Sequence, residues 1–468
     1  MSREERALGD LAGILGDAVS EARERGRKTI VSATVPSVIE DPAATVFASR
    51  RAGDDWFCWE QAGGEVSIAG LGVADSVVSR GPDRFDDLAA ECAHLSGEAV
   101  VLDPEGAGHR TGPLWCGGFA FDGQGGQAPE WSPFPPARMW LPELVLERSE
   151  GSTALSLNLV VTGSTDVDRV VEDALVRARG LIEKELPLLD PAPGGSTRVE
   201  SSGDPGDFER AIAEATGRIR SGALDKVVLA REVIVSSDTP FDPGALFGAI
   251  REGFPTCFNF CVGTPQASFI GASPELLVSS EGRTVAAVGL AGSSRRSSDP
   301  AVDDHLGQRL LASPKDRAEH DFVVRRIVDS LQRLSIWVEA SSQPEVIKVA
   351  NIQHLATPVI AQLAEPKTVI ELAALLHPTP AVGGEPWGEA AKVIGDVEGM
   401  DRGWYAGPVG WMDGSGDGVF CVALRSALLR DREAHLYAGV GVVADSDPEA
   451  ELAETEIKLE ALLPLLTD

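Results

Sequence analysis

Positive charge is scarce in this sequence. Its 468 residues include 41 lysines and arginines against 72 aspartates and glutamates, which gives a formal net charge of −31. This balance argues against nucleic-acid binding, because phosphate backbones are held by clustered lysine and arginine, and against an anionic membrane surface. A small anionic ligand still fits if a metal ion, lysine, arginine or backbone amides gather positive charge locally.

Long apolar runs and targeting signals are also missing. No stretch approaches the roughly 20 apolar residues that a membrane helix needs. The first residues, MSREERALGDLAGILGDAV, lack the basic start, apolar block and small-residue cleavage site of a signal peptide. We therefore expect a surface helix at this end and a cytoplasmic protein with no membrane partner.

Cysteines are few and match no metal motif. The six cysteines lie in apolar contexts, and only Cys257 and Cys261 are near each other, at a spacing that fits no common zinc pattern. We expect buried, reduced thiols. No G-x-G-x-x-G sequence opens a helix after a strand, so a nucleotide-binding fold has little support.

The order of the expected elements indicates the fold class. Apolar residues at helical spacing predict a helix over 166–186. The Pro-, Gly- and Ser-rich segment 187–207 is predicted to be a linker or a long surface loop. Groups of strands followed by helices, with many hairpins, predict an α+β fold with antiparallel sheets. Four apolar segments form two predicted hairpins: 55–61 with 65–74, and 137–148 with 154–161.

The last predicted helix, 448–466, carries a candidate metal site. Glu451, Glu454 and Lys458 stand at i, i+3 and i+7 and so share one face. Paired carboxylates suit a hard cation such as Mg²⁺, and Glu319, near the start of another predicted helix, is a candidate third ligand. A solvated acidic face with a Glu454–Lys458 ion pair explains the same spacing, and a helix-start acid explains Glu319.

Two ionisable residues stand beside apolar strand residues. Glu275 precedes Leu276 and Leu277, and apolar surroundings raise the pKa of a glutamate, which suits a general acid. Lys226 opens the predicted strand 224–235, where partial desolvation would favour its neutral form, as a general base requires. A glutamate on the outward face of a strand and a lysine that reaches past a strand end to solvent explain the same patterns.

Three further features are candidate ligand contacts. Arg425 stands within the apolar segment 418–431, predicted as one strand, where an arginine pairs either with a buried acid or with a ligand carboxylate. His354 is either a core residue or a ligand contact. The stretch PTPAVGG, 378–384, has turn chemistry that can bring backbone amides close to a ligand.

Ten short motifs follow one another from residue 225 to the C-terminus. They are DKVVLARE, FIGASPELLV, GLAGSSRR, KDRAEHDFVV, HLATP, HPTPAVGG, DRGWYAGPVGW, ALRSALL, YAGVGVV and AETEIKLEALL. Together they resemble the chorismate-utilising enzymes, and most closely the isochorismate synthases. The resemblance is specific from about Asp207 onwards and loose before it. It implies one α+β domain with two large antiparallel sheets packed orthogonally and helices outside. Residues 1–200 would be its variable half and 201–468 its chorismate-binding catalytic region.

The resemblance also implies a metal and an acid–base pair. By matching motifs, Glu319 and Glu454 are the implied ligands of one Mg²⁺, and Glu451 is its direct or water-mediated neighbour. Lys226 is the implied general base and Glu275 the implied general acid. The reaction implied is the addition of water at C2 of chorismate with loss of the C4 hydroxyl, which gives isochorismate.

Chorismate itself, a dianion, is the implied partner of the remaining residues. The metal would hold its ring carboxylate. Arg425 and the amide of Gly439 would clamp its enolpyruvyl carboxylate. The other implied substrate contacts are Gly292, His354, Ala381 and Lys458.

Lys226 also separates branches of the family. The ammonia-using anthranilate and aminodeoxychorismate synthases generally lack a lysine there, so no glutamine amidotransferase subunit is expected. HPTPAVGG resembles the isochorismate-only group, although Val382 stands where leucine is common. Salicylate synthases, which keep both lysine and glutamate and also eliminate pyruvate, are one alternative, and a non-catalytic anion-binding homologue is another. The long N-terminal half resembles menaquinone-pathway members more than the shorter siderophore ones.

Overall fold

Two large sheets form the framework of the molecule. The computed structural model describes residues 3–103, 110, 112–183, 190–349 and 351–467. The larger sheet has thirteen strands in these residues, with β19 (Gly384–Glu385) paired to β11 off its main path. The main path, in spatial order, is β10 (Thr197–Ser201), β11 (Lys226–Ser237), β23 (Glu433–Val442), β22 (Ser426–Arg430), β13 (Ser268–Ser273), β12 (Phe258–Gly263), β2 (Trp56–Glu60), β3 (Val66–Leu71), β8 (Leu144–Ser149), β9 (Ser152–Val161), β1 (Thr29–Ser37) and β5 (Val100–Leu102).

The smaller sheet has ten strands in the same residues, with β17 (Glu345–Lys348) paired to β18 off the path. Every pairing in both sheets is antiparallel except that of β1 with β5. The predicted α+β class with two large sheets is therefore confirmed. In spatial order, the other strands are β16 (Ser335–Ala340), β18 (Ile352–Leu363), β15 (Thr284–Arg295), β14 (Leu276–Glu281), β21 (Gly418–Val422), β20 (Pro408–Met412), β6 (Trp115–Phe119), β7 (Ala137–Leu141) and β4 (Asp75–Ser79).

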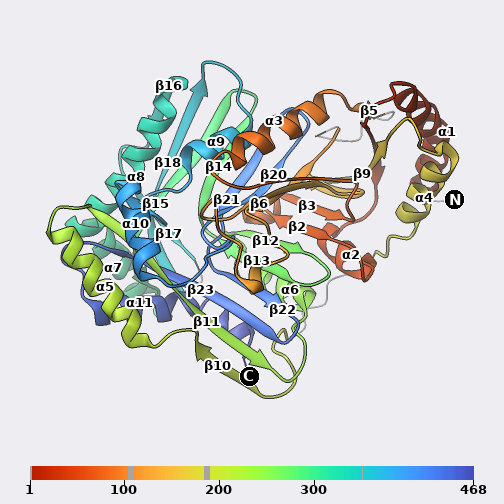
Figure 1. Ribbon diagram of the computed structural model, residues 1–468. Helices are drawn as coiled ribbons and strands as arrows, with labels where there is room; N and C mark the ends of the chain where they lie inside the picture. Colours follow the sequence, from red (N-terminus) through yellow and green to blue (C-terminus); the bar gives the residue numbers. More distant parts are fainter. Residues whose placement is uncertain (1–2, 104–109, 111, 184–189, 350, 468) are drawn as a thin grey trace.

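The two halves of the chain join in the middle of both sheets. β12 pairs with β2 in the larger sheet, and β20 pairs with β6 in the smaller one. Figure 1 shows β1 to β9 in red to yellow, mostly toward the right, and the strands from β11 onwards in green to blue, in the middle and toward the left. Hydrogen bonds between strands therefore continue from one half of the chain into the other.

Helices lie on the outside of the sheets (Figure 1). Many of them begin with an Asp-Pro or Ser-Pro pair: the side chain caps a free helical N–H, and proline suits the first turn because its missing N–H is not needed there. None of the described helices is long and apolar enough to cross a bilayer. The helices are α1 (Arg3–Glu24), α2 (Pro42–Ser49), α3 (Arg84–Gly97), α4 (Val167–Arg179), α5 (Pro205–Arg220), α6 (Pro243–Gly253), α7 (Pro300–Ala312), α8 (Pro314–Gln332), α9 (Val369–Leu376), α10 (Trp387–Val397) and α11 (Pro448–Leu459).

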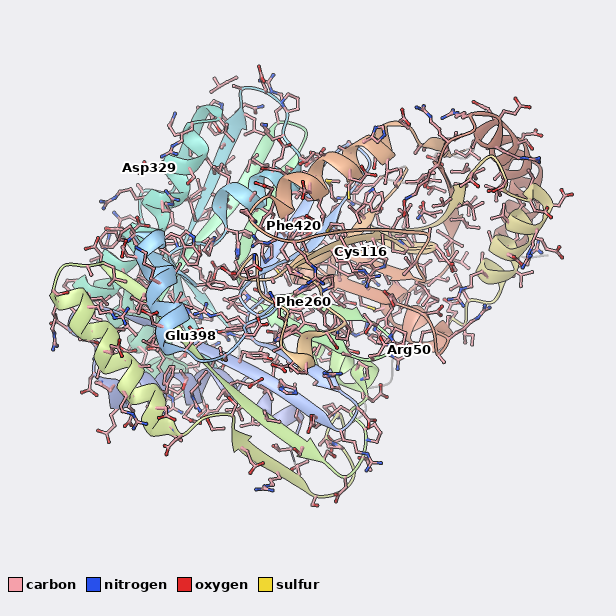
Figure 2. All side chains as sticks on the ribbon, in the orientation of Figure 1. Arg50, Cys116, Phe260, Asp329, Glu398 and Phe420 are labelled. Atoms are coloured by element: carbon pink, nitrogen blue, oxygen red, sulfur yellow. The ribbon has the colours of Figure 1, made fainter. Side chains whose placement is uncertain are left out.

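Side chains from both sheets make one large core. Phe260 of the larger sheet and Phe420 and Cys116 of the smaller one belong to the same buried cluster. Figure 2 shows these three in the middle of the molecule, whereas Asp329 of α8 lies at the outside. All six cysteines are buried free thiols, as expected.

Two predicted strands are each divided in the structure. The segment 137–148 becomes β7 and β8, which belong to different sheets, and the break falls at Pro142, which has no N–H for a ladder. The segment 418–431 becomes β21 and β22, again in different sheets, and Arg425 lies in the link between them with a φ of 47°. The predicted place of Arg425 inside one strand is therefore wrong.

The segment 187–207, predicted as a linker or loop, is described from residue 190 onwards, and residues 187–189 lie outside the described part of the chain. The described part differs from the prediction. Residues Thr197–Ser201 form β10, the edge strand that pairs with β11. The residues of this edge strand are all exposed or half-buried and show no apolar pattern, so proline and glycine dominated the prediction.

Candidate active site

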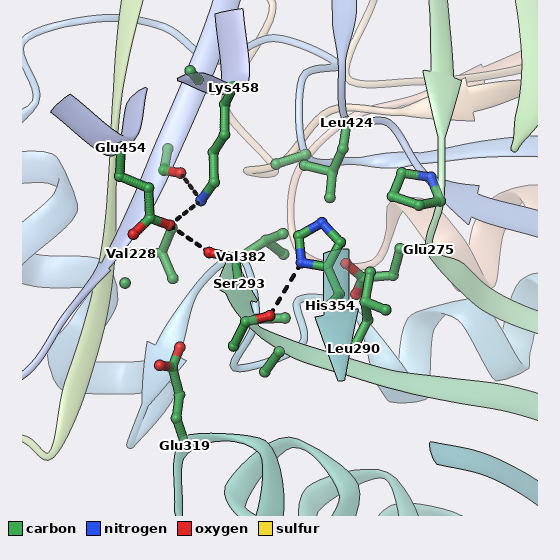
Figure 3. A pocket seen from close by; sticks show the side chains of 18 of the residues that line it. Val228, Glu275, Leu290, Ser293, Glu319, His354, Val382, Leu424, Glu454 and Lys458 are labelled. Carbon is green, nitrogen blue, oxygen red and sulfur yellow. Dashed lines mark hydrogen bonds and ion pairs between the residues drawn. The ribbon is translucent and has the colours of Figure 1, made fainter. Parts of the chain in front are cut away.

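A pocket lies between the two sheets at the first residues of β11. It is lined by residues of β11 and β23 from the larger sheet, of β15 and β18 from the smaller one, and of helices α8 and α11. The space between its lining residues is about 1090 Å³, including the part that is open to solvent. All eleven residues with a predicted role line it, and Figure 3 labels Glu275, Glu319, His354, Glu454 and Lys458 among them.

Lys226 is enclosed by the pocket. It is the first residue of β11, is only 4% exposed, and its Nζ lies 2.6 Å from Oε1 of Glu319 on α8. Gly441 on the paired strand β23 makes room for both, since a Cβ there would lie 2.9 Å from the Lys226 Cε and 3.0 Å from that carboxylate oxygen. Lys226 therefore does not reach past the strand end to bulk solvent.

Glu275 is buried in the link between β13 and β14. It is 2% exposed, and its carbonyl accepts a hydrogen bond from the Val422 N–H while its own N–H donates to Ser273 Oγ. Burial raises the pKa of Glu275 to about 8, although a hydrogen bond from Thr379 and the charge of Lys226 act to lower it. The carboxyl therefore holds its proton at neutral pH, as a general acid must.

His354 and Arg425 form a buried pair. The Gly292 carbonyl lies 3.1 Å from His354 Nδ1, which must be the protonated nitrogen, so Nε2 accepts the hydrogen bond from Arg425 Nη2 at 2.8 Å. Burial and the charges of Arg425 and Lys458 lower the pKa of His354 to about 3, which keeps the ring neutral.

Arg425 stays charged, and no described residue gives it an acidic partner. Burial lowers its pKa only to about 10, and no carboxylate among the described residues forms an ion pair with it. Arg425 Nη1 also donates a hydrogen bond to Oδ1 of Asn351 at 3.3 Å. A buried guanidinium that faces a pocket and forms no ion pair with a described carboxylate is suited to a ligand anion.

Helix α11 brings a carboxylate–lysine pair to the pocket. Glu454 Oε1 lies 2.9 Å from Lys458 Nζ and accepts a hydrogen bond from Ser293 Oγ at 3.0 Å. Burial acts to raise the pKa of Glu454, but Lys458 and Ser293 outweigh it and hold that pKa below its usual range. Lys458 Nζ also donates to the Gly439 carbonyl at 2.8 Å, so helix and strand are tied at the pocket wall (Figure 3).

Comparison with known proteins identifies the family. A family model described as "Chorismate binding enzyme" matches residues 17–467. The chain belongs to this family. It is 32% identical to isochorismate synthase MenF of Bacillus subtilis over 96% of both chains, and 35% identical to the salicylate biosynthesis isochorismate synthase of Pseudomonas aeruginosa over 99% of this chain and 95% of that protein.

Solved structures agree with this assignment. The menaquinone-specific isochorismate synthase MenF of Escherichia coli superimposes with a TM-score of 0.77 over 97% of this chain and 99% of that one, at 27% identity. Anthranilate synthase component I of Streptococcus pneumoniae has a TM-score of 0.65 over 87% of this chain and 91% of that one, at 21% identity, and shows the shared fold alone.

The carboxylates of this chorismate-binding enzyme suit a hard cation by type. Glu319, Glu451 and Glu454 line one pocket from two helices, and oxygen donors of this kind are those that Mg²⁺ prefers. In the described part of the chain no three such side chains form a compact metal cluster. Glu319 and Glu454 instead each bind a lysine. The pKa of Glu451 is raised, mainly by burial and also by the nearby charge of Glu454, although a hydrogen bond from Ser446 acts to lower it.

Several pocket residues were not predicted from the sequence. Tyr405 and Tyr437, the only two tyrosines of the chain, both line the pocket and stack on each other with ring centroids 5.2 Å apart. Arg402 and Lys315 also reach it. Tyr405 and Arg402 belong to the motif DRGWYAGPVGW. The rarity of tyrosine in the chain was the sequence signal that could have indicated Tyr405 and Tyr437.

Proposed function

We propose that this protein converts chorismate to isochorismate. The observation that carries the proposal is that Lys226, a neutral Glu275 and Arg425 line one pocket, and that Arg425 forms no ion pair with a carboxylate in the described part of the chain. The reaction needs a base to activate water, an acid to protonate the leaving hydroxyl, and a cation to bind the dianionic substrate. The whole-length relatives named as isochorismate synthases support the same reaction.

The proton transfers are assigned to two side chains. Lys226, in its neutral form, takes a proton from the water that adds at C2. Both ring double bonds shift as the C4–O bond breaks, and Glu275 gives its proton to the departing hydroxyl. One water enters and one leaves, so substrate and product have the same composition. The base and the acid need different environments. Glu275 is enclosed and has Thr379, an uncharged residue, as its side-chain hydrogen-bond partner, whereas Lys226 is bonded to the carboxylate of Glu319.

Binding is assigned to charged side chains in the pocket wall. Arg425, fixed by His354 and Asn351, binds the enolpyruvyl carboxylate, with the Gly439 amide beside it. Glu319 and Glu454, with Glu451 nearby, would hold Mg²⁺, which when bound neutralises the ring carboxylate. Gly292 positions His354 through its carbonyl, and Ala381 and Lys458 complete the wall.

Product analysis tests the reaction. Purified protein is incubated with chorismate and Mg²⁺, with and without ammonium, and the products are separated by chromatography. Isochorismate alone, unaffected by ammonium, is the expected result and also fits the expectation of no amidotransferase subunit. Salicylate and pyruvate would make the protein a salicylate synthase, an aminated product would overturn the role of Lys226, and unchanged chorismate would indicate a non-catalytic homologue.

For the product's use we propose menaquinone biosynthesis, in the cytosol. Near-complete coverage of the E. coli menaquinone-specific structure and the buried free thiols support this. A strain that lacks the protein should lose menaquinone. Normal menaquinone with loss of a siderophore or salicylate would assign the enzyme to that route, as the name of the P. aeruginosa relative has it.

A further inference from the structure

Arg402 joins two walls of the pocket that are distant in the sequence. Its side chain is 4% exposed and lies in the segment between α10 and β20. Nη1 donates to the Val382 carbonyl at 2.9 Å, and Nη2 donates to the Val228 carbonyl of β11 at 2.8 Å. The guanidinium also lies over the Phe121 ring, 4.1 Å from its centroid. One side chain therefore bridges strand β11, which begins with Lys226, and the turn that carries Ala381 and Val382.

Glu398 holds this arginine in place. Its Oε2 accepts from Arg402 Nε at 2.8 Å, its Oε1 pairs with Nη2, and the side chain is 3% exposed. The same Oε1 accepts the Ala230 N–H of β11 at 2.8 Å. Figure 2 labels Glu398 near α10 and the lower strands. The pair is thus fixed to the strand from two sides, and one Nη1 N–H is all that Arg402 has left for another partner.

The turn that Arg402 holds also contacts the acid. Residues Thr379–Gly383 form a tight turn, with the Val382 and Gly383 N–H groups both bonded to the Thr379 carbonyl. Thr379 Oγ1 lies 3.4 Å from Glu275 Oε1. The Gly383 carbonyl accepts the Val228 N–H at 2.9 Å, so both polar backbone groups of Val228 are used to hold the turn, one directly and one through Arg402.

We propose that Arg402, oriented by Glu398, is a positioning residue that sets the spacing between the Lys226 strand and the turn beside Glu275. The proposal rests on the proposed function of this pocket. Four of the five N–H groups of Arg402 are bonded to protein carbonyls and to Glu398, so we assign its effect on the substrate to the two walls that it joins. A planar guanidinium can reach both carbonyls and Glu398 at once, which a lysine ammonium of similar charge cannot do.

The test compares Arg402→Gln and Arg402→Lys with Arg84→Gln. Arg84 is a matched control: it is 7% exposed, donates to the Gly81 and Ala120 carbonyls, lies over Phe85, and is outside the pocket. We expect both Arg402 variants to lose kcat on the order of 100-fold with KM within about threefold, since a small misplacement of reacting groups has that effect. The Arg84 variant should lose about as much thermal stability as the Arg402 variants do, but its kcat should stay within about twofold of the wild-type value.

Two further variants keep the proposal falsifiable if Arg402→Gln unfolds. Arg402→Ala should regain kcat when guanidinium ions are added, and Glu398→Gln, which keeps an oxygen for the Ala230 N–H, should lower kcat on the order of 10-fold at constant KM. Unchanged kcat in folded Arg402 variants would overturn the proposal, as would a KM increase at constant kcat, because that result assigns Arg402 to substrate binding. Rates are taken on whichever product the wild type makes from chorismate, so a wild type that makes no isochorismate refutes only the proposed function.

Discussion

The substitution Glu275→Gln tests two things: the catalytic role of the carboxyl, and the effect of burying that carboxyl on the stability of the folded chain. Below about pH 4.5 the carboxyl is protonated in both the folded and the unfolded chain. Between there and about pH 8 only the folded chain keeps the proton, so rising pH favours unfolding of the wild type by about 1.4 kcal/mol per pH unit. Glutamine does not titrate. The variant should therefore gain about 3 kcal/mol over the wild type between about pH 5.5 and about pH 7.5.

The assay is urea unfolding of both proteins at the two pH values. Glu252→Gln is the control, because Glu252 is an exposed residue of α6 and its variant should follow the wild type at both pH values. The same Glu275 variant should have no turnover, since an amide cannot give up its proton to the leaving hydroxyl, and wild-type kcat/KM should fall as pH rises through about 8. A constant stability difference between the pH values would show that Glu275 is ionised in the folded chain and would refute its role as the acid.

Three further substitutions test the other assignments. Lys226→Ala should abolish turnover while calorimetry still detects chorismate binding with Mg²⁺, and retained turnover would remove Lys226 as the base. Glu454→Gln should weaken activation in a Mg²⁺ titration, because one of the proposed ligands loses its charge, and an unchanged titration would place the metal elsewhere. Arg425→Lys should raise KM on the order of 10- to 100-fold, because the fork that binds His354 and a carboxylate is lost, and an unchanged KM would contradict the carboxylate clamp.

Local pattern was sufficient for elements whose partners lie close in sequence. The strand that begins at Lys226, the hairpin of β2 with β3, and helix α11 each follow from periodicity and turn residues within some twenty positions. Runs such as 137–148 and 418–431 were misassigned as single strands. A strand buried in either sheet shows the same apolar run, so composition does not reveal that the chain passes from one sheet to the other.

The candidate site depended on a resemblance that spacing alone does not supply. Helical periodicity places Glu451 and Glu454 on one face, but it cannot show that this face meets Glu319 of α8 across a pocket. The role of Arg402 was out of reach for the same reason, because its partners are two backbone carbonyls that no side-chain pattern marks.

Water labelled with ¹⁸O tests the central claim most directly. The protein is incubated with chorismate and Mg²⁺ in labelled water, and the product is examined by mass spectrometry. If Lys226 activates solvent water for addition at C2 and Glu275 assists loss of the C4 hydroxyl, the isochorismate formed early in the reaction will carry one heavy oxygen. Isochorismate without the label would mean that the hydroxyl moves within the substrate, and would contradict the assignment of a separate base and acid.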